Sequence, residues 1–253
     1  MPLPSLLFIH GAANGAWVWE AWQAQLRPLG WNPIVLDLRG HGLSLPVDFS
    51  EVTMEDYLAD VESVAGQVTV ALGVHPVIAG WSMGGLVALM YAAKHPKTPA
   101  VVAFSPSMPL EVAGKASIEA LRAIPSTPVG PEHYGIFVDD LEASRPALAG
   151  LTDDESRRVL AQSAGARESG FARRQRYRGI SVPAGAIQAP ALVIYGEAEA
   201  EPRPTEARRL AVYLGGESIG AAGAGHWGIV YSEATVAALA PLLDAWLRRE
   251  LGA

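Results

Sequence analysis

The stretch Gly80-Trp81-Ser82-Met83-Gly84-Gly85 is the feature that most constrains the fold of this chain. It stands between an apolar run at 77–79 and a second apolar run at 86–93. These flanks predict a buried strand, a sharp turn and a buried helix. A serine at the tip of such a turn has a strained backbone, so small residues are needed two positions before and after it. Gly80 and Gly84 occupy those positions.

The same turn predicts a nucleophile. Backbone strain would hold the Ser82 hydroxyl above the strand ends, and the Met83 amide at the helix start could donate to a developing oxyanion. A serine hydroxyl is a poor nucleophile at neutral pH, so it needs a base within reach and a third group that orients that base. The G-x-S-x-G pattern is weak alone, and its strand-before, helix-after context strengthens it.

Composition limits the protein classes. A chain of 253 residues can form one large α/β domain with an insertion. Half the residues are apolar and 18% are charged, which excludes disorder and fits a sheet buried on both faces. The formal charge of −7 is spread along the chain and predicts no nucleic-acid partner. No cysteine occurs, so thiol nucleophiles, disulfides and thiolate metal sites are excluded.

The first residues carry no basic segment, and their apolar run is too short for a signal peptide or a membrane span. We therefore expect a cytoplasmic protein without a membrane partner.

Short apolar runs predict a mostly parallel central sheet of about six strands, flanked by helices. Amphipathic spacing predicts helices at 53–72 and 232–249. The predicted strands lie at 6–9, 32–38, 77–79, 100–104, 191–195 and 216–219.

The strand pattern stops between residues 108 and 188. This block joins two crevice-facing strand ends and predicts a helical lid, inserted into a core formed by 1–107 and 189–253. Its helix-like segments are 116–124, 133–142, 153–165 and 171–180. The basic run at 173–178 could hold a substrate carboxylate, but such runs more often form a solvated helix face, and we interpret it that way.

Loops after parallel strands should line one crevice. The loop at His10-Gly11-Ala12 places the Ala12 amide as a second oxyanion donor. Asp37, Arg39 and His41 are interpreted as residues that tie loops together. The predicted pocket members are Gly11, Trp81, Met108, Leu121, Phe137 and Trp227.

The chain presents its candidate catalytic groups in the order Ser82, acid loop, His226. His226 follows a glycine-rich loop and is the predicted base. Three acids follow the strand at 191–195. Glu199 is favoured because it lies three residues past Gly196, whereas Glu197 and Glu201 remain alternatives.

These motifs resemble the α/β-hydrolase fold superfamily over nearly the whole chain. The shortened start, without the family's usual first hairpin, and residues 10–19 are similar to the small methylesterase and hydroxynitrile-lyase branch. The lyases typically have Thr at the position of Gly11 and Lys at that of Trp227, so the resemblance disfavours lyase chemistry. The family's usual acid is Asp, where this chain has Glu199. The motifs are His10-Gly11, Asp37-x-Arg39-Gly40-His41-Gly42, the Ser82 turn, Gly196-Glu197-x-Glu199 and Gly225-His226.

The resemblance implies a serine hydrolase. We expect a carboxylesterase that cleaves small to medium esters through an acyl-enzyme, with a Ser-His-Glu triad and no metal or organic cofactor. A thioesterase, lactonase, carbon–carbon bond hydrolase, acyltransferase or perhydrolase could use the same triad. A lid-gated receptor for a small ligand is the alternative from outside the enzymes. Ser82 at the turn disfavours dehalogenases and epoxide hydrolases of this fold, which have Asp there.

Overall fold

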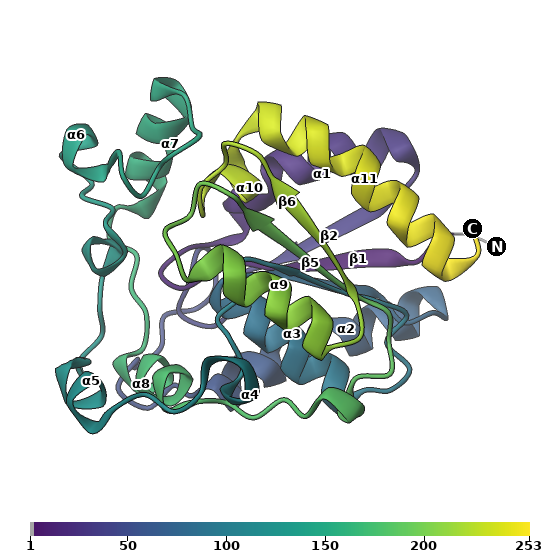
Figure 1. Cartoon of the computed structure of the whole chain (residues 1–253), viewed down its shortest axis with the longest axis horizontal. Helices are drawn as coiled ribbons and strands as arrows, with labels where there is room; N and C mark the ends of the chain where they lie inside the picture. The colour runs from purple at the N-terminus through teal and green to yellow at the C-terminus, as the bar shows by residue number, and fades with distance from the viewer. Residues whose placement is uncertain (1–2) are drawn as a thin grey trace.

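A computed structural model describes residues 3–253, and a six-stranded parallel sheet lies at its centre (Figure 1). The strand order is β2-β1-β3-β4-β5-β6, and every neighbouring pair is parallel. The predicted six-strand sheet is thus confirmed, and within the described residues it is parallel throughout. The strands are β1 (Ser5–Ile9), β2 (Asn32–Leu36), β3 (Val77–Trp81), β4 (Val101–Phe104), β5 (Ala191–Gly196) and β6 (Glu217–Ala221).

Helices cover both faces of the sheet, which explains why the central strands β1, β3, β4 and β5 are buried at every position. Alternate side chains of β1 show the division: Phe8 packs into the core on one face and Leu7 into the core on the other. One face carries α1 (Glu20–Leu26), α10 (Gly228–Tyr231) and α11 (Glu233–Leu251). The other carries α2 (Met54–Leu72), α3 (Met83–Lys94) and α9 (Arg203–Tyr213) (Figure 1).

The predicted helix at 53–72 forms because its ends are well capped. Thr53 accepts a hydrogen bond from the Asp56 amide, and the Asp56 carboxylate accepts one from the Thr53 amide. This reciprocal pair satisfies amides that the first turn of a helix leaves without an intrahelical acceptor. Gly73 ends the helix in a left-handed conformation, with a φ of 73°. Two short 3-10 helices, Ala16–Trp19 and Arg27–Leu29, flank α1.

Most of the segment from 108 to 188, here called the cap, lies beyond the carboxyl ends of the strands, and its last residues run back past α3 to the start of β5 (Figure 1). The prediction of a helix at 133–142 is wrong. A 3-10 helix ends at Tyr134, and Gly135 turns the chain with a φ of 73°. The cap elements are α4 (Leu110–Ala113), α5 (Ile118–Ala123), the 3-10 helix Pro131–Tyr134, α6 (Leu141–Ser144), α7 (Asp153–Ser163), α8 (Gly170–Arg178) and the 3-10 turn Ala184–Ala186.

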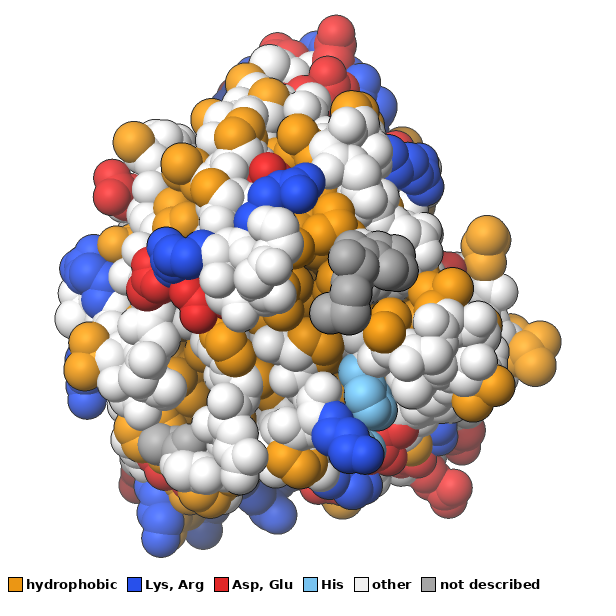
Figure 2. All heavy atoms as spheres, turned by 90° about the vertical axis from the view of Figure 1, so that its right-hand side faces the viewer, with side chains coloured by type: hydrophobic (Ala, Val, Ile, Leu, Met, Phe, Trp, Pro, Cys, Tyr) orange, Lys and Arg blue, Asp and Glu red, His pale blue; other side chains and the backbone are white. Residues whose placement is uncertain are grey.

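Figure 2 shows the face at the far end of the molecule from the cap. Acidic and basic side chains are interspersed around its edge, and hydrophobic side chains lie between them. Among the described residues in this view, no continuous basic surface is present. None of the helices formed by residues 3–253 combines the length and the apolar character needed to cross a membrane.

Candidate active site

The turn between β3 and α3 has the strained backbone that the sequence predicts. Ser82 has a φ of 56° and a ψ of −118°, outside the regions that a non-glycine residue ordinarily adopts. The turn is held on both sides. The Ser82 amide donates to the Phe104 carbonyl at 2.9 Å, and the Ser82 carbonyl accepts from the Ser107 amide at 2.8 Å. The loop after β4 therefore fixes the position of Ser82.

The glycines around Ser82 are required by close backbone approach. A Cβ atom on Gly80 would lie 2.1 Å from the Gly84 carbonyl oxygen, and one on Gly84 would lie 2.4 Å from the His10 carbonyl oxygen. Both distances are far below van der Waals contact, so only glycine fits at either position. The expectation of small residues two positions before and after Ser82 is confirmed in physical terms.

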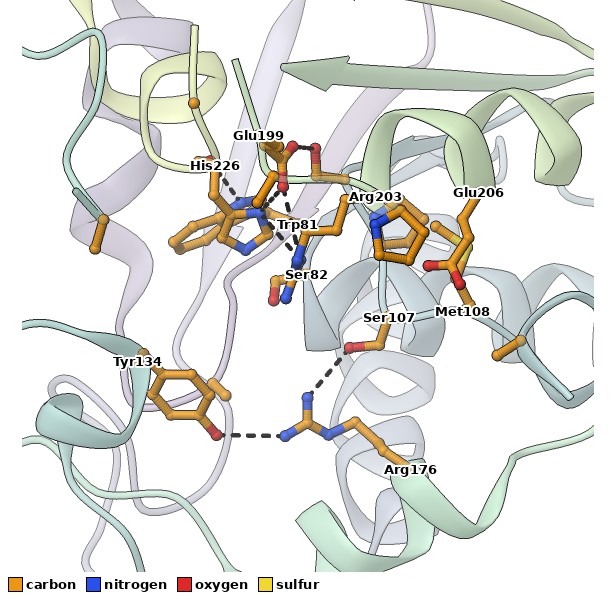
Figure 3. A pocket seen from close by; sticks show the side chains of 18 of the residues that line it. Trp81, Ser82, Ser107, Met108, Tyr134, Arg176, Glu199, Arg203, Glu206 and His226 are labelled. Carbon is orange, nitrogen blue, oxygen red and sulfur yellow. Dashed lines mark hydrogen bonds and ion pairs between the residues drawn. The ribbon is translucent and has the colours of Figure 1, made fainter. Parts of the chain in front are cut away.

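Glu199 and His226 are in direct contact. His226 Nδ1 lies 2.9 Å from Glu199 Oε2, and the other oxygen of Glu199 accepts a hydrogen bond from the Ser105 hydroxyl. The Glu199 side chain is 2% exposed, whereas that of His226 is 23% exposed. Trp81 supports the imidazole from the side, because its ring packs against that of His226 and its Nε1 donates to the His226 carbonyl (Figure 3).

The pKa values of this pair favour a negative carboxylate beside a neutral imidazole. Burial alone would raise the pKa of Glu199, but His226 and the Ser105 hydroxyl outweigh it and hold that pKa below its usual range. Burial lowers the pKa of His226 below its ordinary value of 6.5, and the hydrogen bond that His226 donates to Glu199 only partly opposes that shift. At neutral pH His226 is therefore mostly uncharged and able to accept a proton.

The other two candidate acids lie elsewhere. Glu197 and Glu201 are exposed, and Glu201 faces Arg208 at 4.0 Å. Sequence reasoning missed Arg203, whose Nη1 lies 3.6 Å from Glu199 Oε2 and 3.5 Å from His226 Nδ1. Arg203 follows Glu199 by four residues, which is the signal that places a cation beside that acid. Its charge lowers the pKa of both Glu199 and His226.

Two backbone amides are available near Ser82. Met83 is the first residue of α3, where helical amides lack an intrahelical acceptor. Within residues 3–253 the Ala12 amide donates to no backbone carbonyl, and Ala12 lines the same cavity as Ser82. Neither amide donates to a backbone carbonyl of the described residues, and Met83, unlike Ala12, is not among those that line the cavity.

His10 holds the Ala12 loop in place, a role that sequence reasoning did not assign. His10 is fully buried, and its Nε2 accepts from the Leu38 amide at 3.1 Å. Its Nδ1 consequently carries the proton and donates to the Gly11 carbonyl at 2.7 Å. Burial lowers the pKa of His10 to about 4, so this bridge is uncharged and intact at neutral pH.

Ser82 opens into a cavity of about 700 Å³ between the strand ends and the cap. Of the six predicted pocket members, Trp81, Met108 and Trp227 line it. The assignment of Gly11 is wrong, because Gly11 is not among the described residues that line the cavity; a Cβ atom there would come within 2.8 Å of the Trp81 ring.

The assignment of Leu121 and Phe137 to this pocket is wrong. Neither is among the described residues that line the cavity. Leu121 lies on α5. Phe137 is 42% exposed and borders a smaller hollow, which is lined by residues of 131–140 and 165–167. Their position depends on how the short cap helices pack, which apolar character alone does not specify.

Asp37 and Arg39 tie loops together, as predicted, whereas the His41 side chain donates within its own loop, to the Arg39 carbonyl at 2.9 Å. Asp37 accepts from the amides of Ala16 and Leu43, at 2.6 and 2.9 Å. Arg39 pairs with two acids of α2 at 2.7 Å each. None of the three is among the described residues that line the cavity.

The basic run at 173–178 is not simply a solvated face. Arg176 is only 8% exposed and lines the same cavity as Ser82. The residue one turn earlier on α8, Ala172, is fully buried as well, so both point inward from the same side of the helix. The interpretation from sequence is therefore wrong for Arg176.

No group of three or more His, Asp or Glu side chains within residues 3–253 converges in a way that could hold a metal ion.

Comparison with known proteins places these features in a family. The sequence pattern of the alpha/beta hydrolase family matches residues 6–239. A pimeloyl-acyl-carrier-protein methyl ester esterase of Neisseria meningitidis is 35% identical over 88 residues. Those residues make up 35% of this chain and 25% of the esterase, so the similarity spans about a quarter of that relative.

Solved structures share the fold. A monoacylglycerol lipase from Paleococcus ferrophilus superposes with a TM-score of 0.71 and 22% identity, covering 99% of this chain and 97% of the lipase. An extracellular alpha/beta-hydrolase from a Paenibacillus species gives a TM-score of 0.71 and 19% identity, over 96% and 98% of the two chains. At these identities the likeness is one of fold.

The close approach at Gly84 predicts a measurable loss of stability. Gly84→Ala forces a Cβ atom against the His10 carbonyl and should destabilise the protein by roughly 1–3 kcal/mol in urea unfolding, as for an overpacked core. Gly66→Ala is the matched control. Gly66 lies inside α2, is exposed and has no atom within 4 Å of the position that a Cβ would take, so the change should stabilise by about 0.5–1 kcal/mol. Unchanged stability of Gly84→Ala would contradict the account of the turn.

The contacts of His226 predict opposite pKa shifts in two variants. Carbon–proton NMR titration, with the signal assigned from a His226→Gln sample, should place its midpoint below 6.5. Glu199→Gln removes a carboxylate that raises the pKa of His226 and should lower the midpoint further. Arg203→Gln removes a cation that lowers that pKa and should raise the midpoint. Shifts in the reverse directions would mean that these groups do not face the imidazole in solution.

Proposed function

The chain belongs to the alpha/beta hydrolase family, and we propose that it is a serine carboxylesterase that cleaves small to medium carboxylic esters through an acyl-enzyme. The observation that carries the proposal is one shared cavity. Ser82, on its strained turn, opens into the same space as His226, whose Nδ1 is held by the buried Glu199. A nucleophile, a base and an orienting carboxylate are the groups that acyl transfer by serine requires.

The contact with Glu199 sets the direction of proton transfer. Because Nδ1 of His226 donates to the carboxylate, Nε2 holds a lone pair and takes the Ser82 proton as Oγ attacks the ester carbonyl carbon. The carbonyl electron pair moves onto its oxygen, where the Met83 and Ala12 amides stabilise the negative charge. When the carbonyl re-forms, the bond to the alkoxy group breaks and His226 returns the proton to that leaving group.

Water repeats the sequence on the acyl-enzyme. His226 takes a proton from water as its oxygen attacks the acyl carbon, and the same two amides hold the second oxyanion. Collapse releases the carboxylic acid, and the proton returns to Ser82. The lowered pKa of His226 supports this cycle, because the imidazole is uncharged before each attack.

Glu199 can serve as the triad acid, a position at which the family usually has an aspartate. Glu199 receives hydrogen bonds from Ser105 at one oxygen and from His226 at the other. Ser105 is itself buried in a left-handed conformation, with a φ of 35°, directly after β4. The Ser105 hydroxyl, directly after β4, thus hydrogen-bonds Glu199, which follows β5 and is one methylene longer than the usual aspartate.

Packing at two positions favours hydrolysis over lyase chemistry. The Gly11 position has no room for a threonine, because even a Cβ atom would come within 2.8 Å of the Trp81 ring. Trp227 is 4% exposed and packs edge to face against Trp81, so an indole fills the place where the resembling lyases have a lysine.

The proposal is tested by turnover of p-nitrophenyl esters of increasing acyl length, with a thioester and a lactone alongside. The wild-type protein should hydrolyse p-nitrophenyl esters within one range of acyl length. Glu199→Gln should lower kcat by roughly 10²- to 10⁴-fold, because the imidazole loses its orienting carboxylate. Exclusive turnover of the thioester or of the lactone would mean that the same residues carry out thioesterase or lactonase chemistry instead.

Two variants calibrate that result. Glu201→Gln should stay within about twofold of wild type, because Glu201 is exposed on the same loop. Ser82→Ala should set the floor, on the order of 10⁴-fold or more below wild type. A severe effect of Glu201→Gln with a mild effect of Glu199→Gln would mean that Glu201, and not Glu199, is the acid of the triad. Full activity of Ser82→Ala would overturn the mechanism, and a ligand-dependent change in protease sensitivity of the cap without any turnover would favour a receptor.

A further inference from the structure

Arg176 forms a buried cationic group in the wall of the Ser82 cavity. It reaches in from α8, and its Nη2 donates to Glu168 and, at 3.5 Å, to the Tyr134 hydroxyl. Its Nη1 donates to the Ser107 hydroxyl at 3.2 Å (Figure 3). The residues Arg176, Ser107 and Tyr134, here called the cap clamp, all line the cavity.

The clamp keeps its charge although it is buried. Taking a guanidinium out of water costs several kcal/mol unless a partner offsets it. Glu168 supplies that partner: it is fully buried, and its two oxygens bind Arg176 and the Tyr134 hydroxyl. The pair thereby holds the guanidinium rigidly against the cavity wall.

Arg176 keeps hydrogen-bond donors that no described residue accepts. A guanidinium carries five N–H groups, and the bonds to Ser107, Tyr134 and Glu168 use three of them. Nε is buried and has no hydrogen-bond partner within residues 3–253. Because Nε is buried, the second N–H of Nη1 is the donor left for a ligand in the cavity.

The charges around the cavity are divided between its walls. The lining residues drawn from 107–179 include Lys115 and Arg176, and no acid is present among those described residues. The two acids that line the cavity, Glu199 and Glu206, both come from the core side after β5, where Arg203 is the one Lys or Arg among the described lining residues. An anionic group is therefore favoured at the cap wall and disfavoured at the core wall.

The clamp is close to the reacting serine. The Ser107 amide donates to the Ser82 carbonyl at 2.8 Å, and the Ser107 hydroxyl accepts from Arg176 at 3.2 Å. One short side chain joins these two bonds, so Nη1 lies within about 10 Å of the Ser82 backbone by covalent geometry. A single small molecule can reach both groups.

We propose that the cap clamp binds a carboxylate carried by the substrate at a distance from its ester bond. The unused N–H of Nη1 and the Ser107 hydroxyl proton can both be donated to a carboxylate, and the charge of the guanidinium strengthens the first of these bonds. This assignment rests on the proposed esterase function and narrows its substrate class from simple esters to esters with an acidic tail.

The test compares esters that differ only in charge. Monomethyl adipate and the methyl ester of adipic acid monoamide share a chain and a single ester bond, and the acetate ester of an ω-hydroxycarboxylic acid, with its primary amide as neutral counterpart, puts the carboxylate on the alcohol side. In at least one series the wild-type protein should give a higher kcat/KM for the charged ester. In Arg176→Gln/Glu168→Gln the ratio of charged to neutral kcat/KM should fall roughly 10- to 100-fold.

The double variant is chosen because Arg176→Gln alone would leave Glu168 buried without its cation. Arg178→Gln is the matched control, since Arg178 lies on the same helix and is exposed. It should leave the ratio unchanged. A wild-type preference for the neutral ester in both series, or an undiminished ratio in the double variant, would overturn the proposal.

A binding measurement separates this proposal from the proposed function. Calorimetry of Ser82→Ala with adipate reports on the clamp without any turnover. Adipate should bind, and its affinity should fall by a similar factor when Arg176→Gln/Glu168→Gln is added. Binding without ester turnover by the wild-type protein would keep the clamp and remove the esterase. Turnover of neutral esters without adipate binding would keep the esterase and remove the clamp.

Discussion

The close approach of three backbone segments at Ser82 is the constraint on which the site depends. The start of α3 passes so near to the end of β1 that Gly84 cannot carry a side chain, and Gly80 is equally confined by α3. This contact pushes Ser82 into a strained conformation. It also brings the start of α3 against the Ile9 and His10 carbonyls, where the loop that carries Ala12 begins. The strain persists because the surrounding buried strands cannot move apart without losing their core packing.

Two buried polar side chains near the turn, Glu199 and His10, have hydrogen-bond partners at both of their polar atoms. Glu199 can be almost fully buried as a carboxylate because Ser105 and His226 occupy its oxygens. His10 does the same for the Ala12 loop by bridging the Gly11 carbonyl and the Leu38 amide. Each set of hydrogen bonds positions a group that faces the cavity, so local stability and the geometry of the site have one cause.

The core of the fold was predictable from the sequence because its signals are local. The apolar runs of β1, β3 and β5 are short, buried and bounded by turn residues, and the turn glycines have one structural explanation. The order of Ser82, acid loop and His226 led to the pair that the structure brings together. Glu199 could be favoured over its neighbours only by its depth in the loop, since exposure depends on the folded chain.

The cap was harder to predict, since its short helices are positioned by tertiary contacts. Gly135 interrupts an otherwise helical pattern, and the faces that bear Leu121 and Phe137 turn away from the cavity. The basic run conceals Arg176, because its neighbours at 173–175 and 177–178 are more exposed. The clue is its spacing of four residues from Ala172, which puts both on the buried side of α8.

The central claim is that the fold makes Ser82 an activated nucleophile. The most direct measurement is covalent labelling of the native protein with a fluorophosphonate, with mass spectrometry to locate the adduct and a heat-unfolded sample as control. The account predicts one adduct, on Ser82, that forms only in the folded protein. A native protein that stays unlabelled, or that is labelled at Ser105 or Ser107 instead, would contradict it.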